Sequence, residues 1–196
     1  MEFTQRQNIQ YIAFLLLLAV VTQVIYTVLY DIAKDVPRQW LWGIEGVLFA
    51  ALAAIAGSAL VQSKKNSLGF SAVLVSAILN IVQVGIGFAQ FSAFREAAQN
   101  VEGLAPATGS VVALSFFIYN AAKILLGLAA LIFGMAALKA GLTLLGRLTV
   151  LFGVVAIATN TIVVILGRID SVPSGATGVI ATLLLAGCLF KLQAED

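Results

Sequence analysis

Long apolar runs, separated by short stretches that hold most of the charges, organise this chain. Five stretches contain no charged residue and a sixth contains one: residues 7–30, 46–63, 66–94, 148–167, 171–190 and 103–138. Leu, Ile, Val, Ala and Gly fill most of them. Because about 20 such residues form a helix that crosses ~30 Å of hydrocarbon, the pattern predicts six transmembrane helices.

The fold class predicted from this pattern is all-α, a polytopic membrane bundle in which residues 1–196 form a single six-helix transmembrane domain. The expected helices cover residues 8–30, 39–62, 68–91, 110–138, 148–167 and 174–190. Pro37, Pro106 and Pro173 then fall in connections, where proline is tolerated. The longest connection is expected at residues 93–109, with a short surface helix at its start. The first apolar run is too long for the core of a signal peptide, so it counts as a helix.

Composition supports a membrane protein and excludes several chemistries. Hydrophobic residues make up 61% of the chain and charged residues 10%, against roughly 45–50% and about 25% in soluble domains. The absence of histidine excludes imidazole haem ligation, histidine zinc sites and histidine general bases. The single cysteine, Cys188, cannot form an internal disulfide or a cysteine metal cluster. We expect no metal, no cofactor, no nucleic-acid partner and no enzymatic activity.

Lysine and arginine positions predict the orientation. The two chain ends and the second and fourth connections hold six basic residues: Arg6, Lys64, Lys65, Lys139, Arg147 and Lys191. The other three connections hold four basic residues, which five acidic residues outnumber. Because basic residues concentrate on the cytoplasmic side, we expect an integral protein of the cytoplasmic (inner) membrane with both ends cytoplasmic. Trp40 and Trp42 then lie at the outer interface, which favours indole rings.

A weak internal repeat relates two parts of the chain. With Gly57 aligned on Gly134, the segment GSALVQSKKNSLG matches GMAALKAGLTLLG without a gap. The match has two possible explanations. One is chance similarity among helices rich in Ala, Leu and Gly, and the other is a pair of parallel hairpin repeats, helices 2–3 and helices 4–5. The run LLGLAALIFGMAALK, a short basic turn and GRLTVLFGVVAIA resemble uncharacterised six-helix bacterial membrane proteins with a domain of unknown function. That resemblance covers helices 2–5 and implies no functional residues.

Two ionisable residues fall inside the predicted hydrocarbon region, Glu45 and Lys123. Counted back from the aligned glycines, at about 1.5 Å per residue, they lie at nearly the same height. An unpaired charge at that depth costs ~2.5–3.5 kcal/mol on insertion scales, so we predict an intramembrane ion pair between Glu45 and Lys123. Two interpretations stay open: a pair that fixes helix packing, and a site for a proton or a substrate.

Other polar side chains gather at one level, in the half of the membrane predicted to be outer. They are Gln23, Tyr26, Asn80, Gln83, Asn120 and Asn160. Such a layer serves either hydrogen bonds between helices or a small polar cavity open to the outside. Since helices rich in Ala and Gly, such as helices 2 and 4, pack closely, we expect no large outward-open pocket.

These observations favour a non-catalytic multi-pass membrane protein that serves as an accessory or scaffolding subunit of a membrane complex. Its partners would be the lipid bilayer and other membrane protein subunits. The alternative is a small-ligand binding or transport protein with a polar site in the outer half of the membrane. In size, helix number and predicted orientation the chain resembles the substrate-binding components of vitamin-uptake transporters, which implies a bound small molecule.

Overall fold

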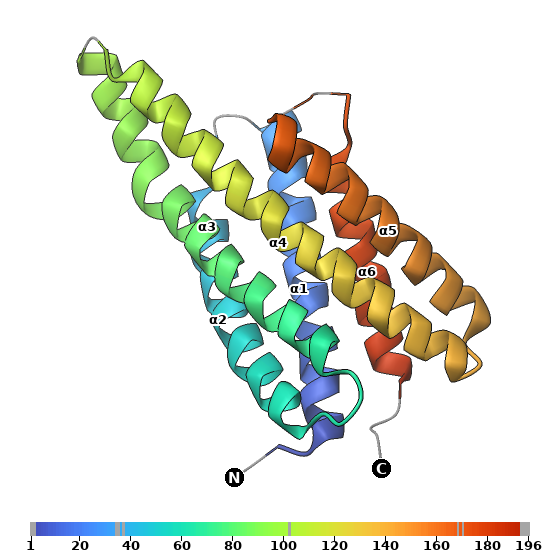
Figure 1. The fold of residues 1–196 in the computed structure, drawn as a ribbon. Coiled ribbons are helices and arrows are strands. Elements are labelled where there is room, and N and C mark those ends of the chain that lie inside the picture. The colour runs from blue at the N-terminus through green and yellow to red at the C-terminus, as the bar shows by residue number, and fades with distance from the viewer. Residues whose placement is uncertain are drawn as a thin grey trace.

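The chain folds into a bundle of long α-helices (Figure 1). The structure, a computed structural model, describes residues 3–33, 36, 38–101, 103–167, 169 and 171–192. The described residues form six helices and no strand: α1 Gln5–Ile32, α2 Gln39–Gln62, α3 Ser67–Asn100, α4 Ala105–Lys139, α5 Thr143–Leu166 and α6 Ser174–Lys191. All six are long and apolar enough to span a membrane, which confirms the predicted fold class.

The end of α3 and the start of α4 differ from the prediction. The long connection expected at residues 93–109 is wrong, because α3 continues to Asn100 and α4 already begins at Ala105. Pro106 therefore lies in the first turn of α4, where a missing N–H costs no helical hydrogen bond. The prediction ended each helix where its apolar run ends. These two helices continue beyond the ends of their apolar runs. They project beyond the other four in Figure 1.

Within the described part of the chain, helix contacts follow a closed order around the bundle. α1 packs against α2 and α6, α2 against α3, α3 against α4, and α4 against α6. α5 lies outside this ring and packs on α4 and α6. We call the end that holds the start of α1 and the end of α6 the terminal end, and the opposite end the distal end (Figure 1). α2 and α4 are not neighbours in the ring.

Glycines hold α4 and α5 close together in the terminal half. A Cβ added to Gly127 would lie 2.9 Å from the carbonyl oxygen of Gly153, and one added to Gly134 would lie 3.2 Å from that of Gly146. The small residues of α4 thus form an internal contact. The aligned position on α2 differs, because a Cβ at Gly57 would meet nothing within 4 Å. The internal repeat stays a prediction.

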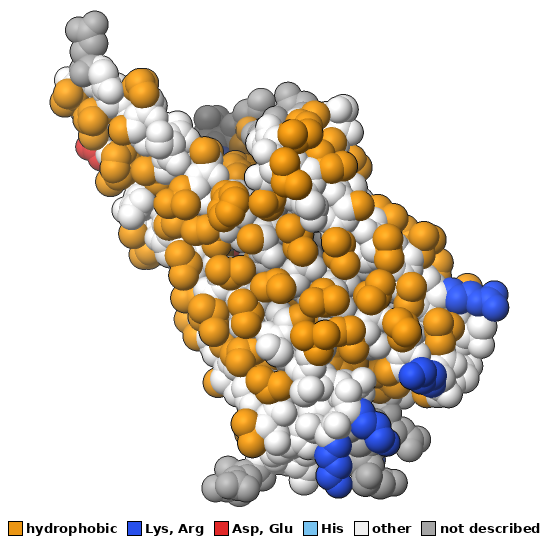
Figure 2. Space-filling view, in the orientation of Figure 1, with side chains coloured by type: hydrophobic (Ala, Val, Ile, Leu, Met, Phe, Trp, Pro, Cys, Tyr) orange, Lys and Arg blue, Asp and Glu red, His pale blue; other side chains and the backbone are white. Residues whose placement is uncertain are grey.

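Large apolar side chains fill the terminal half of the ring. Leu16, Phe49, Phe70 and Phe133 are fully or almost fully buried there, and the rings of Phe70 and Phe133 pack edge to face at 4.9 Å. On the bundle surface, hydrophobic side chains cover the middle, and the visible Lys and Arg side chains gather toward the terminal end (Figure 2). The ring is therefore closed by packing in its terminal half.

Candidate functional site

The distal half of the bundle contains a cavity of about 1170 Å³. Residues of all six helices line it, together with Val36, Arg38, Ile169 and Val172 of the connections. The expectation of no large pocket is therefore wrong. Its premise was that Ala and Gly faces close the bundle. Those of α4 close only the terminal half, and Ala50 and Ala54 of α2 are exposed on the outside. Tyrosine, tryptophan and glutamine occupy inward positions of the distal half.

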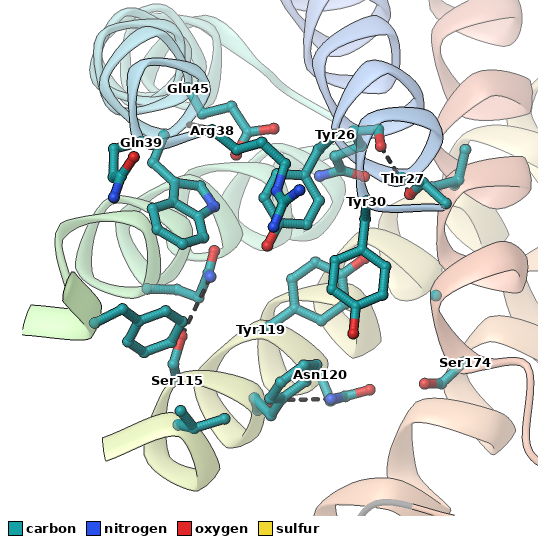
Figure 3. A pocket seen from close by; sticks show the side chains of 18 of the residues that line it. Tyr26, Thr27, Tyr30, Arg38, Gln39, Glu45, Ser115, Tyr119, Asn120 and Ser174 are labelled. Atoms are coloured by element: carbon teal, nitrogen blue, oxygen red, sulfur yellow. Dashed lines mark hydrogen bonds between the residues drawn. The ribbon is translucent and has the colours of Figure 1, made fainter. Parts of the chain in front are cut away.

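Glu45 of α2 brings a carboxylate to the wall of this pocket (Figure 3). The residue is only 6% exposed. Its Oε1 lies 2.8 Å from the hydroxyl of Thr22 on α1, which also lies 2.9 Å from the carbonyl oxygen of Ala19. The hydroxyl has one proton and can donate to only one of these oxygens at a time. Glu45 therefore retains capacity to accept hydrogen bonds from a molecule in the pocket.

Lys123 of α4 lies directly behind the pocket and is 1% exposed. Its Nζ donates to Gln23 Oε1 on α1 at 2.9 Å and lies 5.2 Å from the ring centroid of Tyr119. Its aliphatic stem passes Gly178 of α6, where an added Cβ would lie 3.0 Å from Lys123 Cδ. The glycine leaves the room that the lysine needs to reach α1. Gln23 and Tyr119 both line the pocket, so the ammonium group underlies its polar wall.

The predicted contact between Glu45 and Lys123 takes a different form. Among the described residues neither side chain hydrogen-bonds to the other, and each contacts one of the consecutive α1 residues Thr22 and Gln23. The physical reason is the ring order, because α2 and α4 are not adjacent. The two buried charges are instead linked through one turn of α1.

The predicted polar layer divides into two groups. Gln23, Tyr26, Gln83 and Asn120 line the pocket. Gln83 Nε2 donates to Ser115 Oγ at 3.3 Å, and Asn120 Nδ2 donates to the carbonyl oxygen of Phe116 at 2.7 Å. In the part of the chain that the structure describes, Asn120 Oδ1 has no hydrogen-bond partner. These side chains therefore keep hydrogen-bonding capacity beside the cavity.

The remaining two members of the layer are buried outside the pocket lining. Asn80 donates to the carbonyl oxygen of Ser76 at 2.9 Å, and Asn160 donates to that of Ala156 at 2.7 Å. Both bonds stay within their own helix, a common arrangement for polar side chains in apolar helices. Asn160 also lies 3.4 Å from the carbonyl oxygen of Ser174. Among the described residues their Oδ1 atoms, like that of Asn120, have no hydrogen-bond partner, but neither residue lines the cavity.

An aromatic wall and an arginine complete the pocket; of these residues only Tyr26 was predicted as part of a site, and Tyr30, Arg38, Trp42 and Phe91 were not. The ring of Trp42 lies 5.6 Å from that of Tyr26 and 5.4 Å from that of Phe91, measured between centroids. The Arg38 guanidinium lies over the rings of Tyr26 and Tyr30, at 5.6 Å and 5.3 Å (Figure 3). Trp42 was predicted to anchor the interface. The sequence does not show that Trp42 faces inward, because Trp40, two residues earlier, has the same side chain and is 50% exposed.

No protein-family model, no curated protein and no solved structure matches this chain. The resemblance to uncharacterised six-helix bacterial membrane proteins stays a prediction. Within the described residues, no group of three or more His, Cys, Asp or Glu side chains could hold a metal ion. The groups that line the pocket are carboxylates, arginines, amides, hydroxyls and aromatic rings.

Proposed function

We propose that this protein is a non-catalytic membrane protein that binds a small organic molecule in the distal pocket. The observation that carries the proposal is a cavity of about 1170 Å³ with a buried carboxylate and several amides on its wall. Ligand sites in proteins typically measure ~300–1,000 Å³ and combine apolar walls with a few placed polar groups. The pocket has that composition and enough room for a drug-sized molecule.

The lining indicates the chemistry of the ligand. Glu45 is the charged side chain on the inner wall, whereas Arg38, Arg95 and Glu96 lie toward the distal end of the cavity. A carboxylate in a site of low dielectric attracts N–H donors and protonated amines, and the tryptophan ring beside it attracts cations. A protonated amine with apolar or ring substituents fits both groups. Figure 3 shows Glu45 and the tyrosines around the same space.

The proposed orientation places the mouth of the pocket outside the cell. The terminal end holds Lys64 and Lys65 between α2 and α3, Lys139 at the end of α4 and Arg147 in the first turns of α5. The positive-inside rule assigns that end to the cytoplasm. A molecule captured from the outside is either retained or passed across the membrane. Binding is therefore the function that we propose, with transport as its extension.

Mass spectrometry of the purified protein tests the proposal. Wild-type protein, isolated in mild detergent or nanodiscs and then denatured, should release a stoichiometric small molecule. Glu45→Gln should retain about 10- to 100-fold less, because a hydrogen bond to a charged group contributes roughly 1.5–3 kcal/mol. Asp31→Asn, which removes an acidic residue at the distal end of α1 that does not line the pocket, is the matched control. An empty wild-type protein, or equal retention by Glu45→Gln, contradicts the proposal.

An accessory role in a membrane complex is the second candidate. The small residues Ala50 and Ala54 of α2 favour it, because they are exposed on the lipid-facing side of the bundle. Small residues on a membrane helix allow another helix to approach closely. Co-purification from native membranes separates the two roles. A stoichiometric protein partner that is lost in an Ala54→Leu variant, while any small molecule is retained, would favour the accessory role.

A further inference from the structure

A second cavity of about 500 Å³ lies between the distal parts of α4 and α5. Every residue that lines it is apolar or a glycine. It shares Val112, Phe116 and Val163 with the distal pocket, so the two cavities meet at these side chains. We call the second cavity the α4–α5 groove. An apolar cavity therefore adjoins the distal pocket.

The α4–α5 groove opens on the lipid-facing surface of the bundle. Leu114 and Phe117 lie on its rim and are 52% and 51% exposed. Val163 lies three residues before the end of α5 at Leu166, which is about 4.5 Å at 1.5 Å per residue. The groove is therefore at the level of one leaflet, near its boundary with water. A chain in the groove would lie among the lipid tails.

The distal pocket has charged lining residues on one side and none on the other. Glu45, Gln83 and Arg38 belong to the side formed by α1, α2, α3 and their connections. Val112, Val163 and Ile180 belong to the side formed by α4, α5 and α6. This uncharged side, on which Ser115, Tyr119 and Asn120 also lie, shares lining residues with the α4–α5 groove. Val112, Val163 and Ile180 form its apolar part, which we call the apolar side of the pocket.

We propose that the ligand is amphipathic: its amine lies at Glu45, and its alkyl chain runs along the apolar side and leaves through the α4–α5 groove into the lipid. This inference rests on the proposed function and adds the class of ligand and a lateral path. Transfer of an alkyl chain from water to apolar surroundings is favourable, and the gain grows with every CH₂ group. A path through the groove keeps the chain in contact with apolar groups from the pocket to the bilayer. A chain contributed by a bilayer lipid is the other occupant, and the test below distinguishes it.

The test uses two amines that differ in chain length, n-butylamine and n-dodecylamine. The protein carries Trp40→Phe, which leaves Trp42 in the pocket as the only tryptophan, and is held in nanodiscs of zwitterionic lipid. Both amines should change Trp42 fluorescence, and dodecylamine should saturate the change at a concentration at least about tenfold lower. Gly109→Leu should remove most of that chain-length advantage, because the added side chain fills the groove.

Gly85→Leu is the matched control for the groove. An added Cβ meets nothing within 4 Å at either Gly85 or Gly109, so both substitutions should fold. Gly85 is exposed on α3, away from both cavities. Comparing the two variants at equal dodecylamine concentration cancels the partition of the amine into lipid. Gly85→Leu should keep the full chain-length advantage.

The outcomes separate this inference from the proposed function. If butylamine binds, and Gly109→Leu keeps the same chain-length advantage as Gly85→Leu, the lateral path is wrong and the binding function stands. The same conclusion follows if Gly109→Leu strengthens butylamine binding, because then a bilayer lipid occupies the groove. If neither amine changes Trp42 fluorescence, or Glu45→Gln responds as the wild type does, amine binding itself is refuted.

Discussion

At the scale of single residues, one turn of α1 holds both buried charges of the bundle. Thr22 contacts Glu45, and the next residue, Gln23, accepts a hydrogen bond from Lys123. The depth of Glu45 and Lys123 could be predicted from the sequence, because distance along a helix is distance across the membrane. Their partners could not, since an α2–α4 contact and a link through α1 require the same depth. Thr22 carried no signal, because threonine occurs often in apolar helices.

Removing the side-chain carbonyl of Gln23 should leave the buried Lys123 ammonium without its hydrogen-bond acceptor. Gln23→Leu should destabilise the protein by roughly 1–3 kcal/mol, whereas Gln23→Leu combined with Lys123→Met should cost less than the two single changes added together. Unfolding of each variant in detergent measures both quantities. Gln99→Leu, an exposed glutamine on α3, is the control and should change stability little. Additive losses in the cycle would mean that the two side chains do not interact.

At the scale of helices, the two halves of the bundle differ. Glycines pack α4 tightly against α5 in the terminal half, whereas the helices enclose a cavity in the distal half. The number of helices and the bounds of α2 could be predicted from hydrophobicity alone. The extensions of α3 to Asn100 and of α4 back to Ala105 could not, because a helix that continues into water has no apolar run to mark it. The positions of small residues also did not indicate which face of a helix packs against a neighbouring helix. Gly127 meets α5 and Gly57 meets nothing within 4 Å, although each lies in a helix rich in Ala, Leu and Gly.

This difference predicts that the same substitution at the two glycines will have unequal effects on stability. Gly127→Val should destabilise the bundle by about 1–3 kcal/mol, because its side chain would overlap the backbone of α5. Gly57→Val should cost much less, since the added atoms enter open space. The midpoint of thermal unfolding in detergent, measured for both variants, decides the matter. Equal losses would show that α4 and α5 do not approach each other as closely as described.

At the scale of the whole molecule, the ring of α1, α2, α3, α4 and α6 creates a property that no single helix has. The ring is filled by large apolar side chains in its terminal half and open in its distal half. The polar layer could be located from the sequence, but the cavity could not. In a membrane, core-facing and lipid-facing sides of a helix are both apolar. The pattern therefore does not reveal which polar side chains face a shared space.

If the distal pocket receives a molecule from outside the cell, water should reach it from one face of the membrane and stop above the packed terminal half. The direct test places single cysteines at Gln83, which lines the pocket, and at Asn80, one turn deeper on α3 and 1% exposed. Both are made in a Cys188→Ala background, which leaves no other thiol, and probed with a membrane-impermeant cationic thiol reagent. The assay uses sealed vesicles of each orientation.

Gln83→Cys should react only in right-side-out vesicles, in which the distal end faces the reagent, and Asn80→Cys should stay unreacted in both orientations. Denatured samples of both variants, which should react fully, confirm that each thiol is present. Protection of Gln83→Cys from both faces, or equal labelling of the two positions, would contradict a pocket that is open at the distal end and closed below Gln83.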